Sequence, residues 1–281
     1  MVLFGEMVKK ARKSLKLTQK EISDGICTQG YYSEIEKGTK IPNIALASSI
    51  CKKLDISFQY FDDPSDIYIS DLKSKIENHF HNYDYNNTIT ILETNKSHFL
   101  LDNSLHNQQF FNFYYCMSKL ILKSDIIDCI ELLHYSSSFA NKDFSPKCLF
   151  IYDLLNAVAL GYAYQLADNK SNALYYSRLS LENIPLLIGD YDNKNKILIY
   201  YFCAKTFHMN AQYNKAKKIL EDGITFALSI KSDYFLPDLY FTLSTCEQTI
   251  GDNAKSMEYH QIASSLMLHP TFRIWKLAQT Q

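Results

Sequence analysis

Apolar residues recur with helical spacing from the start of the chain. The apolar positions of the first such stretch are Phe4, Met7, Val8, Ala11 and Leu15. This spacing predicts a helix with one buried face. Similar short patterns continue to residue 63 and predict five short helices, the last near residues 57–61. Pro64 disfavours helix just before itself, so we expect a boundary between units 1–63 and 66–281.

Capping residues set the limits of the predicted helices in the first unit. Thr18 with Glu21 three positions later matches a capping box, which predicts a helix that starts there. Thr28 predicts the N-cap of a third helix that ends near Lys37-Gly38. Pro42-Asn43 predicts the start of a fourth helix. The first unit therefore consists of short helices joined by tight turns.

The second unit shows a repeat of about 40 residues. A small residue recurs near the start of every second predicted helix, at Thr88, Cys129, Ala173, Ala216 and Ser256. A near-constant period of helix pairs predicts an α-solenoid of about five pairs, and the fold class is all-α. The hairpins resemble tetratricopeptide (TPR) repeats, most clearly at residues 160–173 and 213–227. An irregular helical domain is the alternative.

Composition agrees with helices and divides the chain by charge. The chain has 281 residues, 47% of them hydrophobic, but only 8 Gly and 6 Pro. Residues 1–54 carry ten Lys/Arg and five Asp/Glu, a net charge of +5, while residues 55–281 carry −6. A basic N-terminal unit on an acidic body is consistent with a nucleic-acid-binding head.

Other features of the sequence predict a cytoplasmic protein. Seven scattered cysteines without a C-x-x-C pair fit buried thiols in a reducing compartment. The N-terminus becomes charged too early for a signal peptide, and no run of 18 apolar residues predicts a membrane span. Motifs for hydrolases, nucleotide binding and metalloproteases are absent, so we expect no catalytic residues, cofactor or metal.

Residues 4–61 resemble the helix-turn-helix of the Xre/Cro-like repressor family. The resemblance rests on Thr18-Gln19-Lys20-Glu21-Ile22, Ile26-Cys27-Thr28, Ser33-Glu34-Ile35-Glu36-Lys37-Gly38, Pro42 and Leu54-Asp55-Ile56. It implies that the helix after Thr28 lies in the major groove of operator DNA. It also implies an internal ion pair between Arg12 and Glu36, and a packing role for Tyr32.

The resemblance assigns DNA contacts residue by residue. Gln19 would bind a phosphate or a base edge, and Thr28, Gln29 and Gly30 would present the helix N-terminus to DNA. Gln29 is the candidate for a bidentate contact with adenine. Exposed Tyr31 would touch phosphate or a thymine methyl group, near exposed Ser33. Lys37 and Lys40 suit phosphate contacts.

Two residues depart from the family pattern. Glu34 stands where the family usually has Arg, Lys or Gln; it either accepts from a cytosine N4 amine or is an exposed acid that balances Lys37. Gly30 costs the helix about 1 kcal/mol relative to Ala, and its benefit would be closer backbone approach to DNA.

In architecture the whole chain resembles the PlcR/Rgg (RNPP) group of peptide-pheromone receptors. That resemblance implies a short signalling peptide on a concave face formed by the first helix of each pair. Asn112 and Asn156 lie 17 residues before Cys129 and Ala173, so they are candidate clamps for a peptide backbone. Lys205 is a candidate partner for a peptide carboxylate. The candidates for apolar pockets are Phe202, Tyr240 and Phe241.

These features predict a bacterial transcription regulator. It would bind operator DNA as a homodimer and respond to a short peptide, without a membrane partner. One alternative is a repressor whose repeats bind a protein or small ligand. Another is a repeat scaffold that does not bind DNA. A largely apolar concave groove would favour a peptide, and a flat charged face would favour a protein.

Overall fold

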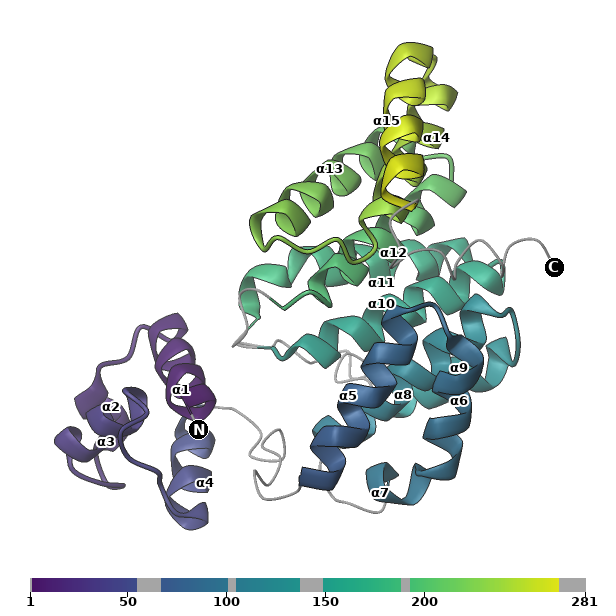
Figure 1. Cartoon of the computed structure of the whole chain (residues 1–281). Helices are drawn as coiled ribbons and strands as arrows, with labels where there is room; N and C mark the ends of the chain where they lie inside the picture. The colour runs from purple at the N-terminus through teal and green to yellow at the C-terminus, as the bar shows by residue number, and fades with distance from the viewer. Residues whose placement is uncertain (1, 55–66, 101–104, 137–148, 188–192, 268–281) are drawn as a thin grey trace.

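The helices of the chain fall into two groups (Figure 1). The computed structural model describes residues 2–54, 67–100, 105–136, 149–187 and 193–267. Within these ranges it has fifteen α-helices, one 3₁₀ turn and one isolated parallel β-bridge, between Leu149 and Leu187. The predicted all-α fold is confirmed. The predicted boundary at residues 62–65 lies outside the described residues.

The N-terminal unit contains four described helices. They are α1 (Val2–Ser14), α2 (Gln19–Ser23), α3 (Gln29–Glu36) and α4 (Ile44–Lys53). The Thr18 capping box is confirmed, because Thr18 Oγ1 accepts from Glu21 N and the Glu21 carboxylate accepts from Thr18 N. Thr28 and Asn43 cap α3 and α4 through their side chains. The predicted fifth helix, near residues 57–61, lies outside the described residues.

The core of this unit uses the predicted apolar faces. Val8, Ala11, Ile22, Tyr32 and Ile50 are fully buried. Phe4 and Leu15, predicted to be inward, are half-buried at the rim of this core. The burial of Tyr32 confirms its packing role. Burial of these side chains packs α1, α2, α3 and α4 around one core.

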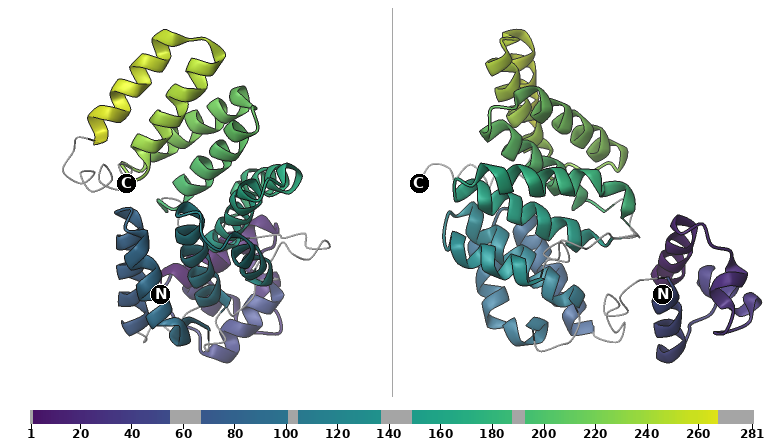
Figure 2. Two further views of the ribbon diagram at one scale, coloured as in Figure 1. Left: turned by 90° about the vertical axis from the view of Figure 1, so that its right-hand side faces the viewer. Right: turned by 180° about the vertical axis from the view of Figure 1, so that it is seen from behind.

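The second unit consists of five consecutive helix pairs, which confirms the predicted repeat architecture (Figure 2). The pairs are α5 (Ile67–His81) with α6 (Tyr85–Thr94), α8 (Leu105–Ile121) with α9 (Ile126–Ser136), α10 (Ile151–Leu166) with α11 (Lys170–Glu182), α12 (Lys196–Met209) with α13 (Tyr213–Ser229), and α14 (Leu236–Ile250) with α15 (Asn253–Met267). A short α7 (Lys96–Leu100) and a 3₁₀ turn η3 (Ile184–Leu186) lie between pairs.

Small residues allow the paired helices to approach each other. Thr88, Cys129, Ala173 and Ala216 are each at most 1% exposed, as the repeat pattern predicts. Ser256, the fifth member of the series, is only half-buried, and Ala263 is the buried residue of its helix, α15. The repeat signal in the sequence therefore reflects close packing within each pair.

The turn between the two helices of a pair has a recurring backbone conformation. In four of the pairs, the residue two positions before the second helix has a positive φ. These residues are Tyr83, Asp168, Ala211 and Gly251. Gly adopts this region freely, whereas a bulky side chain there is uncommon and costs energy. Tyr83 is the bulkiest of the four, so its ring needs a compensating contact elsewhere.

That contact joins the first helix pair to the last. Tyr83 Oη donates to Asp238 Oδ2 at 2.8 Å, and the Tyr83 ring lies 5.3 Å from the Phe235 ring. Two residues earlier, His81 packs on Tyr234 with ring centroids 4.2 Å apart. The solenoid therefore curls until the α5–α6 turn touches the start of α14.

The two units also touch at one described place. The Lys10 Nζ of α1 donates to the backbone carbonyl of Leu187, and Phe150 packs against the core of the N-terminal unit. Leu187 and the neighbour of Phe150, Leu149, are the two partners of the β-bridge. This contact links α1 to the segments that precede α10 and α12.

Candidate DNA-binding surface and ligand groove

The N-terminus of α3 is exposed, and it carries three of the predicted DNA contacts. Thr28, Gln29 and Gly30 are exposed, and the Thr28 hydroxyl accepts from Tyr31 N at 3.2 Å. A Cβ atom added to Gly30 would meet nothing within 4 Å. The helix therefore starts with an uncovered backbone, and its dipole favours a negatively charged partner there.

A buried ion pair fixes the angle between α1, α2 and α3. Arg12 binds Glu36 with two hydrogen bonds, of 2.6 and 3.0 Å, which confirms the predicted pair. Gln19 Nε2 donates to the same carboxylate at 2.7 Å. Burial raises the pKa of Glu36, but the hydrogen bonds from Arg12 and Gln19 outweigh it, so the pKa is lowered overall. Gln19 is half-buried and joins α2 to α3.

The other predicted DNA contacts lie on or just after α3. Tyr31 and Ser33 are half-buried, while Glu34, Lys37 and Lys40 are exposed. Tyr31 Oη donates to the carbonyl of Ile41 at 3.3 Å, so its ring bridges α3 and the segment before α4. No described ion pair joins Glu34 to Lys37, and both interpretations of Glu34 stay predictions. Their contacts with DNA stay predictions.

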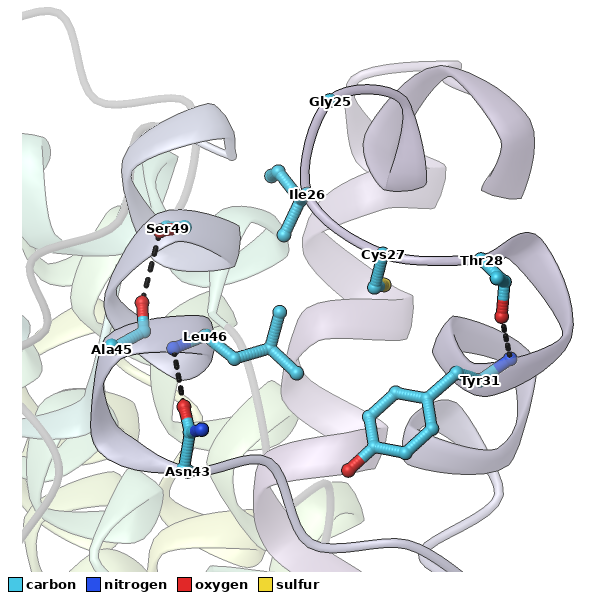
Figure 3. A pocket seen from close by; sticks show the side chains of 9 residues that line it. All are labelled: Gly25, Ile26, Cys27, Thr28, Tyr31, Asn43, Ala45, Leu46 and Ser49. Atoms are coloured by element: carbon cyan, nitrogen blue, oxygen red, sulfur yellow. Dashed lines mark hydrogen bonds between the residues drawn. The ribbon is translucent and has the colours of Figure 1, made fainter.

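An open hollow of about 580 Å³ lies beside α3 (Figure 3). Tyr31 lies on one side of it and Leu46 of α4 on the other, with Cys27 between them. The capping residues of both helices, Thr28 and Asn43, lie at its margin. The N-caps of two helices therefore border one hollow. Apart from its role as a helix start, Asn43 was not among the predicted contacts.

The repeat unit has a second cavity, of about 500 Å³, on the inner side of the curl. It is lined by the first helices α8, α12 and α14, and by the α5–α6 turn. Aromatic and aliphatic side chains make up most of its wall. The lining residues are Tyr83, Tyr85, Ile121, Leu122, Tyr201, Phe202, Lys205, His208, Met209, Phe235, Asp238, Phe241, Thr242 and Thr245. This size and lining suit a small or peptide ligand.

Three of the six predicted peptide-binding residues line this cavity. They are Phe202, Lys205 and Phe241. Tyr240 instead packs against Tyr259 of α15, with ring centroids 6.0 Å apart. Neighbouring positions on one helix face different sides, and the sequence did not show which side of α14 is concave.

The two predicted asparagine clamps are buried in helix packing. Asn156 is 0% exposed and donates to the carbonyl oxygens of Gln109 and Tyr152, at 3.1 and 2.7 Å. Asn112 is 4% exposed. Peptide binding by these amides stays a prediction, but their orientation toward an open groove was wrong. Asn112 and Asn156 recur at the same place in neighbouring repeats because each is buried on the first helix of its pair.

Asp238 and Tyr83 were missed as cavity residues. They are 155 positions apart and meet only because the solenoid curls. The available signal was Tyr83 itself, a large aromatic residue at a turn position where Gly251 stands in the last pair.

Among the described residues, no group of three or more His, Cys, Asp or Glu could hold a metal ion. None of the described helices is long and apolar enough to span a membrane.

Comparisons with known proteins agree with this division. A helix-turn-helix family model matches residues 8–61. The structure of Bacillus thuringiensis PlcR in complex with the peptide PapR7 and DNA has 20% identity and a TM-score of 0.64, and the match covers 99% of each chain. Apo PlcR from the same organism has 18% identity and a TM-score of 0.58, with 97% of each chain covered.

A third similar structure is the apo form of the competence regulator ComR from Streptococcus vestibularis. It has 14% identity and a TM-score of 0.51, and the match covers 99% of this chain and 96% of that one. No curated protein matches the chain. The matched fold, a helix-turn-helix domain followed by TPR-like repeats, therefore extends along the whole chain.

Proposed function

We propose that this chain, a helix-turn-helix DNA-binding domain joined to TPR-like repeats, is a bacterial transcription regulator controlled by a short signalling peptide. It binds operator DNA as a homodimer in the cytoplasm, with one α3 helix in the major groove of each half-site. The peptide binds in the cavity inside the curl of the repeats. One observation carries this proposal. The same chain has an exposed N-terminus of α3 in its first unit and an aromatic-lined cavity in its repeats.

The DNA half of the proposal is supported by charge and exposure. The N-terminal unit is basic, and its residues Gln29, Lys37 and Lys40 are exposed. Lysines supply phosphate contacts, whereas Gln29 can read adenine through two hydrogen bonds. The Arg12–Glu36 pair holds α3 at a fixed angle without using the exposed face.

The peptide half is supported by the groove. The cavity is mainly apolar, has a few polar groups and has a volume of about 500 Å³. A cavity of this size can hold several side chains of a bound peptide. A flat charged face, which would favour a protein partner, is not what these lining residues form. Among the three structures compared, PlcR has been solved with the peptide PapR7 and DNA.

The coupling of the two halves requires that the peptide favour one arrangement of the repeats. The cavity wall includes the contact of Tyr83 with Asp238, which closes the curl. The N-terminal unit contacts the repeats through Lys10, which binds Leu187 directly after η3, and through Phe150, the N-cap of α10. Because α10 packs against α12, a ligand that shifts α12 would also move Phe150 at the start of α10. That movement would change the spacing of the two DNA-binding domains in the dimer.

Selection from a random pool of DNA duplexes tests the DNA-binding function. We expect the full-length protein to enrich two inverted half-sites whose centres lie about 34 Å, or one helical turn, apart or a multiple of that. The Glu34→Gln variant should relax a preference for cytosine at one position, because the carboxylate no longer accepts from its amine. Glu6→Gln, an exposed acid on α1, is the matched control. A pool that remains random with the wild-type protein would contradict the proposal.

A further inference from the structure

The cavity inside the repeats contains two opposite charges that do not pair. Lys205 of α12 and Asp238 of α14 both line it, but no described ion pair or hydrogen bond joins them. Buried or half-buried charges are normally paired with each other. Each of these two groups therefore has capacity for a ligand.

Lys205 is held by aromatic rings instead of a carboxylate. Its Nζ atom lies 5.2 Å from the ring centroid of Tyr162, 5.5 Å from that of Tyr201 and 6.0 Å from that of Phe202. Tyr201 and Phe202 precede it by one turn of the same helix, and Tyr162 comes from α10. The rings stabilise the ammonium group but leave its hydrogen-bond donors available to an anion.

Asp238 is a buried carboxyl in the first turn of α14. It is 9% exposed and accepts from Tyr83 Oη at 2.8 Å. Burial raises its pKa to about 6, and the Tyr83 hydrogen bond and the charge of Lys205 offset only part of that effect. This group therefore changes charge close to neutral pH.

The other titratable groups around Asp238, among the described residues, are tyrosines, a histidine and Lys205. From the α5–α6 turn come Tyr83 and Tyr85, from α12 Tyr201 and His208, and from the segment before α14 Tyr234. Burial raises the pKa of every one of these tyrosines, so they stay neutral. Burial lowers the pKa of His208, which is therefore neutral at pH 7. Lys205 supplies the positive charge of this wall.

We propose that the cavity binds a carboxylate of its ligand at Lys205 and takes up one proton on Asp238 as the ligand enters. This inference rests on the proposed function, in which the ligand is a peptide. The proton comes from solvent and stays on Asp238, whose O–H then donates to the ligand. Two ionised carboxylates at one site would repel each other, so the neutral form of Asp238 is the form that accepts the ligand.

A carboxylate could come from the C-terminus of the peptide or from an Asp or Glu side chain. Two synthetic pools of random heptapeptides, one with free C-termini and one C-amidated, distinguish these sources. Each pool is passed over the full-length protein at about pH 5.5 and about pH 7.5, and retained peptides are measured by mass spectrometry. Preferential retention of the free-acid pool identifies the C-terminus, and enrichment of amidated peptides with Asp or Glu identifies a side chain.

We expect retention of the carboxylate-bearing peptides to fall about 20-fold from pH 5.5 to 7.5. The protonated fraction of Asp238 falls by about that factor over this range when its pKa is about 6. The wild-type protein alone gives this result, so it does not depend on the folding of a variant. Asp238→Asn should retain the peptides equally at both pH values, since the amide is a permanent neutral donor. Lys205→Met should lose the carboxylate preference. Lys215→Met, a lysine over the Phe207 ring outside the cavity, is the matched control.

The possible failures are distinguishable. Retention of apolar peptides without a carboxylate preference, or with equal strength at both pH values, overturns the proton-linked site and leaves the peptide-binding function in place. Retention of neither pool at either pH overturns both proposals.

Discussion

Two buried carboxylates of this chain have opposite surroundings. Glu36 accepts from Arg12 and Gln19, which lower its pKa despite burial. Asp238 accepts from the neutral donor Tyr83, and burial raises its pKa to about 6. A buried carboxylate with a cationic partner stabilises the fold at pH values above its pKa. A buried carboxylate without such a partner destabilises the fold at those pH values. At the residue scale, the charge of Glu36 therefore stabilises the fold, whereas the charge of Asp238 does not.

Replacing Asp238 with Asn should stabilise the protein at neutral pH. The folded-state pKa lies above the unfolded value of 3.8, so the carboxyl favours folding below pH 3.8 and loses that contribution as the pH rises through about 6. The free energy of unfolding of Asp238→Asn minus that of wild type should therefore increase by about 2.4 kcal/mol between pH 4 and pH 7. Urea unfolding at both pH values measures it.

The matched control for that prediction is Asp233→Asn. Asp233 is exposed and lies five residues before Asp238, ahead of the same helix. It should change the free energy of unfolding by the same small amount at both pH values. A difference between Asp238→Asn and wild type that does not vary with pH would show that Asp238 is ionised at little cost in the folded protein.

At the scale of elements, the helix ends followed from the sequence. Thr18, Thr28 and Asn43 each cap the helix that the pattern predicted, because a capping hydrogen bond involves residues only two or three positions apart. The small residues of the repeats were also predictable, because each lies near the start of the second helix of its pair. The direction of Asn156 was not, because it depends on which neighbouring helix lies beside α10. Local chemistry fixes where a helix starts, and packing decides which face is open.

Substituting Gly5 should separate α1 from α3. A Cβ atom there would lie 2.1 Å from the carbonyl oxygen of Ile35, which is backbone and cannot rotate away. Gly5→Ala should therefore reduce the free energy of unfolding by about 1–3 kcal/mol and weaken DNA binding by displacing α3. Thermal unfolding followed by circular dichroism measures the first effect.

Gly30→Ala is the control for this substitution, since its Cβ atom would meet nothing within 4 Å. It should leave stability unchanged or raise it by up to about 1 kcal/mol. Equal melting temperatures for Gly5→Ala and wild type would contradict the close contact of α1 with α3.

At the scale of the whole molecule, two long-range contacts define the arrangement. Tyr83 meets Asp238 across the curl, and α1 meets Phe150 and Leu187 beside the β-bridge. The division into a DNA-binding head and a repeat body followed from charge and periodicity. The curl did not, since a repeat pattern specifies contacts between neighbours and leaves the small rotation per pair undetermined. The residues of the cavity were therefore only partly foreseen.

Fluorescence anisotropy of a labelled duplex from the selected pool measures whether α3 binds DNA. The full-length protein should bind, and its affinity should fall as salt increases, because its lysines displace counterions from phosphates. Gln29→Ala should bind about 10- to 100-fold more weakly, the worth of one bidentate base contact, whereas Gln248→Ala, an exposed glutamine on α14, should bind as wild type does. No binding by the wild-type protein at low salt, or equal affinity of Gln29→Ala and wild type, would contradict the account.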